Sequence, residues 1–208
     1  MKKLGAEIRS WVGSIGAAIG CALLIGIFII QPTKVMGHSM DPTLHDQQRI
    51  FISKISHTFN LEPQYGDIVI LDSRVDRERT FADDLVEHPL ISLFTHEEDN
   101  QTIYVKRVIG KPGDVLEFKN HQVIRNGEPL NEPYLNETMN YSSSEKLTVP
   151  ADHIFVMGDN RNNSKDSRNI GFIPLDHVLG KKYSTIKHRR SHAPFFYFYP
   201  TLLRRQGG

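Results

Sequence analysis

The longest apolar run of the chain lies near its N-terminus, at residues 11–30. This run carries no charged side chain, and Ser14 supplies its only hydroxyl group. A helix rises about 1.5 Å per residue, so a helix over this run would be about 30 Å long, the thickness of a bilayer's hydrocarbon core. The alternative, a cleaved signal peptide, has a shorter apolar region of about 7–15 residues followed by a small-residue cleavage site. The pattern therefore favours a single uncleaved transmembrane anchor over 11–30.

Beyond residue 31 the apolar runs become short and rich in β-branched and aromatic residues, which is typical of strands. Turn residues lie between the candidate strands, which are 68–71, 102–109, 115–118, 122–125 and 154–157. We expect a hairpin around Asn120–His121, followed by a second tight turn at Asn126–Gly127. The pattern predicts a mainly β domain over 31–208.

Three regions of this domain differ from the strands around them. Residues 72–100 are charged and weakly periodic, so we interpret them as an insertion with room for a short helix near 83–93. Residues 115–157 form a hairpin or cap region, within which 131–150 have the composition of an exposed loop. Residues 187–208 form a basic, aromatic tail. It either rests on a membrane interface, where aromatic and basic side chains are favoured, or ends a closing strand.

The charge distribution predicts how the anchor is oriented in the membrane. The chain has 208 residues and a net charge of +1, so nothing attracts it globally to nucleic acid, and we expect no nucleic-acid partner. Three basic residues precede the anchor against the single acid Glu7, and only Lys34 follows it closely. The positive-inside tendency places residues 1–10 in the cytoplasm and 31–208 outside it.

The candidate chemistry begins with a lysine inside an apolar strand. Lys106 has Val105 and Val108 nearby in sequence, and Ser39 lies upstream in a short loop. A serine hydroxyl needs a base to become a good nucleophile. Only about one lysine in 2500 is neutral at pH 7, but burial among apolar groups lowers the pKa by several units. These residues therefore predict a Ser-Lys hydrolase. The alternative is that Lys106 is an ordinary strand lysine with its amine in solvent.

Other candidates for the base or the site are weaker. His38 adjoins Ser39, but neighbouring side chains on an extended chain point to opposite faces, so His38 is badly placed as a base. The single cysteine, Cys21, excludes a Cys-x-x-Cys site, and no His-Glu-x-x-His motif occurs, so we expect no metal and no cofactor.

Residues 158–168 form a third unusual block. They contain glycine, amide, hydroxyl and charged residues in a density that cannot build a core. A solvated surface loop is one interpretation. The alternative is a structured loop in which Asp166 and Arg168 form a charge-assisted pair, which would leave Ser164 to hold a lysine amine.

Together these blocks resemble a known family. Residues 37–44, 104–114 and 158–168, in this order after an anchor, resemble the signature boxes of bacterial type I signal peptidases, and 66–71 resembles a fourth box. A lysine at position 106 resembles the bacterial enzymes, because the endoplasmic-reticulum type carries histidine there. The resemblance implies a predominantly antiparallel β catalytic domain after a single transmembrane helix.

The resemblance also implies residue roles. Ser39 would attack the scissile carbonyl, Lys106 would be the general base, and Ser164 would orient the lysine amine. Asp166 and Arg168 would hold their loop together. The backbone N–H of Ser39 would contribute to the oxyanion hole. The shallow substrate pockets would be lined by Val35, Met40, Leu44, Tyr104 and Val105.

This chain departs from the family pattern at two places. Some members have a hydroxyl two residues before the nucleophile that completes the oxyanion hole, and this chain has Gly37 there, so the backbone of Gly37 or a water molecule is the candidate second donor. Asn162 stands where an acid is common, so we expect a neutral contact in place of a salt bridge.

The implied function is a membrane-anchored serine endopeptidase that removes signal peptides from secretory preproteins after small residues at the −3 and −1 positions. Its partners would be preproteins, the lipid bilayer and, by proximity, the export machinery, and it would sit in the cell membrane. Two alternatives remain. One is a membrane-anchored β binding module without catalysis. The other is a self-cleaving Ser-Lys repressor-type peptidase, which the apolar 11–30 run disfavours.

Overall fold

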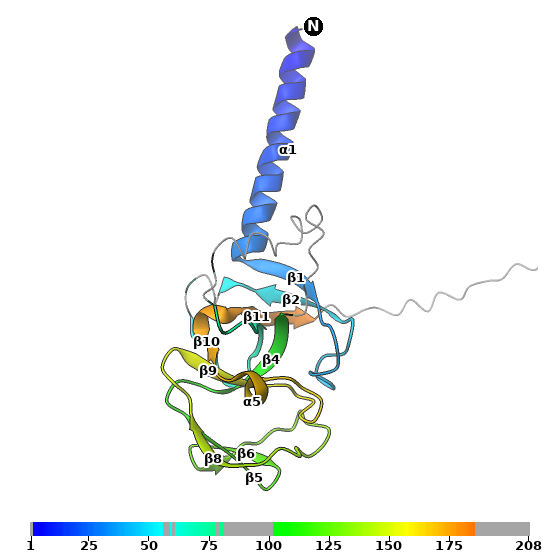
Figure 1. The fold of residues 1–208 in the computed structure, drawn as a ribbon. Coiled ribbons are helices and arrows are strands. Elements are labelled where there is room, and N and C mark those ends of the chain that lie inside the picture. Colours follow the sequence, from blue (N-terminus) through cyan, green and yellow to red (C-terminus); the bar gives the residue numbers. More distant parts are fainter. Residues whose placement is uncertain (1, 56–58, 60, 78–79, 81–101, 186–208) are drawn as a thin grey trace, which may run out of the picture.

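The computed structural model describes residues 2–55, 59, 61–77, 80 and 102–185. One long helix, α1 (Lys2–Phe28), stands out from the β part of the molecule (Figure 1). It begins within the segment predicted as the cytoplasmic N-terminus and ends before residue 30, where the first strand begins. Pro32 accounts for this end, because proline cannot donate the helical hydrogen bond and disfavours helical geometry in the residue before it.

The membrane-spanning character predicted for 11–30 is not established by the structure. No helix within the described residues combines the length and the apolar content that crossing a membrane would need.

A seven-stranded antiparallel sheet forms the larger part of the β domain. Its strands, in spatial order, are β1 (Ile30–Lys34), β2 (Arg49–Ser53), β11 (Val178–Thr185), β3 (Ile68–Asp72), β4 (Ile103–Gly110), β9 (His153–Met157) and β10 (Ile173–Pro174). Two short helices, α5 (Ser167–Ile170) and the 3-10 helix η1 (Leu175–His177), lie between β9 and β11 in the chain. The predicted antiparallel, mainly β architecture is confirmed.

A second, four-stranded sheet lies at the end of the molecule away from α1 (Figure 1). It consists of β7 (Glu128–Pro129), β6 (Gln122–Arg125), β5 (Val115–Lys119) and β8 (Ser143–Thr148), in that order. The predicted hairpin is present, since β5 and β6 pair antiparallel with Phe118 opposite Val123. The predicted turn is present too, with φ of 54° at Asn126 and 85° at Gly127.

Two expectations for this region were wrong. The segment 131–150, expected as an exposed loop, contains β8. This strand lies at the edge of its sheet beside β5, and most of its side chains are exposed and polar. A hydrophobicity pattern therefore does not predict it. The cap region expected over 115–157 also extends too far, because β9 belongs to the larger sheet. The expected helix near 83–93, most of the 72–100 insertion and the whole 187–208 tail lie outside the described residues.

Strand β4 connects the two halves of the core. Its end packs Ile109 into a cluster with Phe118, Phe155 and other buried residues beside the smaller sheet. Its neighbour Val108 packs into a second cluster on the larger sheet, with Val69 and Val156. Packing on both sides therefore holds this strand in place before its polar side chains contribute any contact.

Candidate active site

The loop after β1 carries Ser39 and is fixed from below by apolar side chains. Val35, Met40 and Leu44 are at most 2% exposed and pack in one cluster with residues of β2 and β3. A backbone hydrogen bond of 2.9 Å joins Leu44 N to Met40 O. Met40 and Leu44 thus anchor the serine loop from within the core.

Lys106 points from β4 toward this serine. Its side chain is buried, and Lys106 Nζ lies 2.7 Å from Ser39 Oγ and 3.0 Å from the carbonyl oxygen of Val105. Burial lowers the pKa of Lys106 from 10.5 to about 8, while the negative charges of Asp166 and Asp159 act in the opposite direction. The structure therefore brings together the two residues that the sequence singled out, although they are 67 positions apart.

The 158–168 loop is built around the buried carboxylate of Asp166. This carboxylate accepts hydrogen bonds from Ser164 Oγ (2.8 Å), Gly158 N (3.0 Å) and Arg168 Nε (2.8 Å). It also caps α5. Burial raises the pKa of Asp166, but the hydrogen bond and charge of Arg168 more than offset this, so the pKa of Asp166 lies below 3.8. The Asp166–Arg168 pair has the form expected from the sequence.

Ser164 has a different hydrogen-bond partner from the one expected. Its hydroxyl donates to Asp166, and among the described residues Lys106 Nζ hydrogen-bonds only Ser39 and Val105. A Cβ added at Gly158 would contact Ser164 Oγ and would lie 2.5 Å from the Ser39 carbonyl oxygen. Ser164 therefore lies beside Ser39 without bonding the lysine amine, and only glycine fits between Ser39 and Ser164.

Asn160 joins the 158–168 loop to the serine loop. Its backbone N–H donates to Ser39 O at 3.0 Å, and its side-chain Nδ2 donates to His38 O at 3.1 Å. Asn162 makes the neutral contacts expected of it, to the backbone of Thr138 and Asn140. These hydrogen bonds fix the position of the 158–168 loop relative to the serine loop.

The backbone donors beside the serine are not equivalent. The N–H of Gly37 donates to Asp46 Oδ1 at 2.7 Å, so this group is already engaged and is not offered to a ligand. The Ser39 N–H has no hydrogen-bond partner among the described residues. Of the two backbone groups considered for the oxyanion hole, only that of Ser39 is available.

His38 is held away from the role of a base. Its Nδ1 lies 2.9 Å from Asp41 Oδ2, and the other oxygen of Asp41 contacts His45 Nδ1 at 3.0 Å. Both histidines are mostly exposed. The Ser39 hydroxyl instead faces Lys106.

An open groove of about 530 Å³ runs past the Ser39–Lys106 pair. Of the predicted pocket residues, Val35, Tyr104 and Val105 line it, whereas Met40 and Leu44 lie in the core below. The sequence reading missed the other lining residues, which are Thr33, Lys34, Met36, Ile70, Ile103 and Lys165. Alternation along β1 and β4 was the signal available for some of them, but it does not reveal which strand ends face each other.

The opposite side of β4 carries a network that the sequence did not reveal. Arg107 donates two hydrogen bonds to Asp159, of 2.8 and 2.6 Å, and its guanidinium lies 4.0 Å from the ring centre of Tyr134. Tyr134 in turn donates to Glu132, which forms an ion pair with the buried Arg161. Arg161 Nε also donates to Gly158 O at 3.1 Å. This network fixes Gly158 from behind.

Comparison with known proteins identifies the family. Residues 8–186 match the family model described as signal peptidase, peptidase S26. Signal peptidase I P of Bacillus subtilis subsp. natto is 36% identical over 191 residues, covering 86% of this chain and 88% of that protein. Signal peptidase I of Bacillus licheniformis is 38% identical over 184 residues, covering 84% and 86%. Signal peptidase IB of Staphylococcus aureus (strain COL) is 32% identical over 212 residues, covering 90% and 95%.

A signal peptidase I from Enterococcus faecalis V583, solved as a crystal structure, is 27% identical and covers 58% of this chain and 96% of that one, with a TM-score of 0.39. The mainly antiparallel β domain is typical of signal peptidase I, a serine endopeptidase. The chain belongs to the signal peptidase family, peptidase S26, and is an endopeptidase of the signal peptidase I type.

Proposed function

We propose that this protein is a membrane-anchored endopeptidase that removes signal peptides from exported preproteins, with Ser39 as nucleophile and Lys106 as general base. The observation that carries the proposal is the 2.7 Å contact between the Ser39 hydroxyl and a buried amine whose pKa is lowered to about 8. At neutral pH about one such amine in ten is uncharged, compared with about one in 2500 for a free lysine.

In the proposed reaction, neutral Lys106 takes the proton of Ser39 Oγ while this oxygen bonds to the scissile carbonyl carbon. The carbonyl becomes an oxyanion, which the Ser39 N–H stabilises as a preorganised donor. The Lys106 ammonium then gives its proton to the leaving amine as the peptide bond breaks. Water hydrolyses the resulting acyl-enzyme, with Lys106 again as the base, and restores the Ser39 hydroxyl.

The groove supports binding of the substrate as an extended strand. Residues 103–106 of β4 pair with β3 on one side, while the pairing of β4 with β9 starts only at Arg107. A peptide could therefore add to this part of β4 by backbone hydrogen bonds. Alternate side chains would then point to the floor of the groove. Val35, Tyr104 and Val105 leave shallow space there, which suits small residues at the −1 and −3 positions.

We further propose that α1 anchors the protein in the cell membrane, with its N-terminus cytoplasmic and the catalytic domain on the outer side. This is supported by the uncharged run at 11–30 and by the apolar side chains that α1 exposes, namely Trp11, Val12, Ile15, Ile19, Leu24 and Ile25. A tethered enzyme would meet membrane-bound preproteins, close to the export machinery, at high effective concentration. Alkaline carbonate extraction of membranes tests the anchor, because release of the protein into the supernatant would exclude it.

The catalytic proposal is tested by incubating the purified full-length protein in detergent with a model precursor and sequencing the new N-terminus. We expect one cut after a small residue, and processing by Ser39→Ala that is slower by at least about 100-fold. Processing by Ser39→Ala at the wild-type rate would overturn the assignment. A serine-reactive lactam adds a second readout, since a binding module without catalysis would not be acylated at Ser39.

A further inference from the structure

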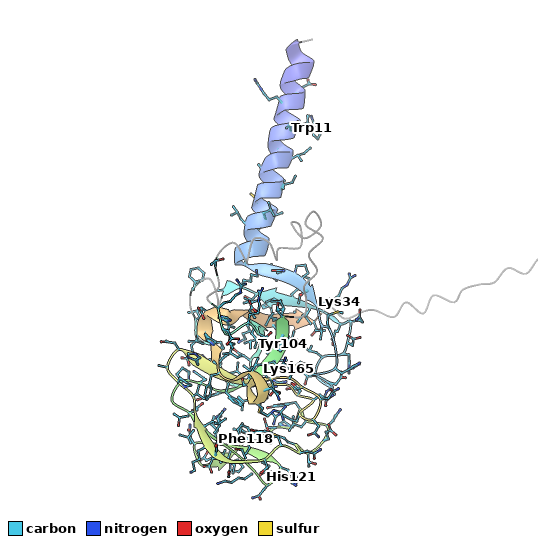
Figure 2. All side chains as sticks on the ribbon, in the orientation of Figure 1. Trp11, Lys34, Tyr104, Phe118, His121 and Lys165 are labelled. Atoms are coloured by element: carbon cyan, nitrogen blue, oxygen red, sulfur yellow. The ribbon has the colours of Figure 1, made fainter. Side chains whose placement is uncertain are left out.

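The groove beside Ser39 is positively charged. Besides Lys106, it is lined by Lys34, at the end of β1, and Lys165, in the 158–168 loop, and no acidic residue is among the lining residues that the structure describes. Figure 2 shows Tyr104, which lines the same groove, between these two lysines in that view. Within the part of the chain that the structure describes, neither Lys34 nor Lys165 forms an ion pair with an acidic side chain, whereas Lys111 and Lys181 do.

The neighbours of the two lysines strengthen this field. Lys34 stands directly opposite Arg49 in the β1–β2 pair, and like charges facing each other across strands destabilise a sheet. Lys165 precedes Asp166, but the buried carboxylate of Asp166 is turned inward and is occupied by Arg168. Both lysines are therefore exposed cations without an acidic partner among the described residues.

We infer that Lys34 and Lys165 are specificity-determining residues that recognise an acidic side chain in the bound peptide. This rests on the proposed function, because the peptide must lie in the groove as an extended strand. In such a strand the −1 and −3 side chains point to the floor, and the −2 and −4 side chains point away from it. The flexible lysines at the groove surface can reach these outward side chains, so the acidic residue belongs at −2 or −4.

The expected size of the preference follows from the exposure of the lysines. An ion pair between solvent-exposed groups changes affinity only modestly, which corresponds to about a two- to fivefold difference in kcat/KM for each charge pair. High salt should reduce the preference, because the charges remain accessible to counterions.

The test uses peptides that differ only by Asp or Asn at −2 or at −4, with the same exchange six residues after the cut as an outside control. For each enzyme variant the readout is the ratio of kcat/KM for the Asp and Asn peptides, which does not depend on the basal activity of the variant. We expect a ratio of about 2–5 at −2 or −4 for the wild type, and a ratio near 1 at the control position and in 0.5 M salt.

The variants assign this preference to residues. Lys34→Gln and Lys165→Gln should each lower the ratio, and the double variant should bring it to about 1. Lys165→Glu should favour a peptide with Lys at the same position. Lys146→Gln, which removes an exposed lysine of β8 outside the groove, is the matched control and should keep the wild-type ratio.

A wild-type ratio of 1 at both positions, or a preference that survives in the double variant, would overturn this inference while leaving the proposed function intact. Failure of the wild type to cut any of the peptides, the Asn peptides included, would instead count against the proposed function.

Discussion

Lys106 and Arg107 are neighbours on strand β4, but their side chains lie on opposite sides of it and their pKa values shift in opposite directions. Lys106 is buried, no carboxylate of the described residues contacts its amine, and burial lowers its pKa to about 8. Arg107 is also largely buried, and although burial opposes its charge, the hydrogen bonds and charge of Asp159 raise the pKa of Arg107 above its ordinary value. The strand period of two places one cation in the groove and the other in the buried network behind it.

This difference shows that burial alone does not decide what a basic side chain does. A guanidinium keeps its proton even when it is buried, and the contact of Arg107 with Asp159 offsets the cost of burying both charges. A buried cation without that contact loses its proton more easily and becomes available as a base. In this fold the lowered pKa and the buried ion pair belong to two consecutive residues, Lys106 and Arg107.

The largest expected effect is on the groove side. Lys106→Met should lower kcat/KM by about 10²–10⁴-fold, because the proposed general base is lost. Cleavage of a precursor peptide by the purified variant measures this. Ser39→Ala should cost a similar amount, and the double variant should be little worse than either single one, since the two residues act as a unit. Independent, multiplying losses would contradict the dyad.

Behind β4 the expected effect is on stability. Arg107→Met leaves the carboxylate of Asp159 buried without its partner, so the free energy of unfolding should fall by about 3–5 kcal/mol. Urea denaturation measures the loss. Adding Asp159→Asn to this variant should recover part of it, because the unpaired charge is then removed. No recovery would mean that Asp159 is not the cause.

Lys106→Met should have the opposite effect on stability. In the unfolded chain the lysine has a pKa near 10.5, and folding lowers it to about 8. The folded state therefore bears a cost of about 3 kcal/mol below pH 8, and this cost disappears as the pH rises to 10.5. The methionine variant should be more stable than the wild type at pH 7, and this advantage should shrink by pH 10.5. Unfolding curves at both values test this, and a constant difference would contradict the lowered pKa.

The smallest of these effects concerns the pH dependence of the wild type. Since the neutral amine is the active form in the proposed mechanism, kcat/KM should rise with pH and level off above about 8. Between pH 7 and pH 9 we expect about a tenfold increase. A profile that is flat from pH 5 to 9 would argue against a lysine base.

Much of the fold followed from local patterns. The hairpin of β5 and β6 was predictable because its turn residues and its apolar alternation agree. Strand β8 was not, because an exposed edge strand of polar residues such as Ser143 and Glu145 carries no hydrophobic signal. The helix end before Ile30 was placed two residues too late, since the apolar run continues after the chain has turned into a strand.

Some features of the site were likewise predictable from the sequence and others were not. The motif around Asp166 and Arg168 led to the right ion pair, because both partners lie within one short segment. Ser164 was expected to bond the lysine amine, but its hydroxyl donates to Asp166. Which of these two partners Ser164 bonds depends on the distance between β4 and the 158–168 loop, which the sequence does not give. Met40 and Leu44 were expected in the substrate groove and lie in the core, because the sequence does not indicate which way a loop side chain turns.

By itself, the sequence singled out the candidate residues of the site, since Ser39, Lys106 and the 158–168 block stand out through composition and order alone. The tertiary structure decided which groups each of them contacts. A pKa and a hydrogen bond depend on distances between segments far apart in the chain. Only folding could place Lys106 at 2.7 Å from Ser39, with Arg107 turned to a carboxylate on the other side.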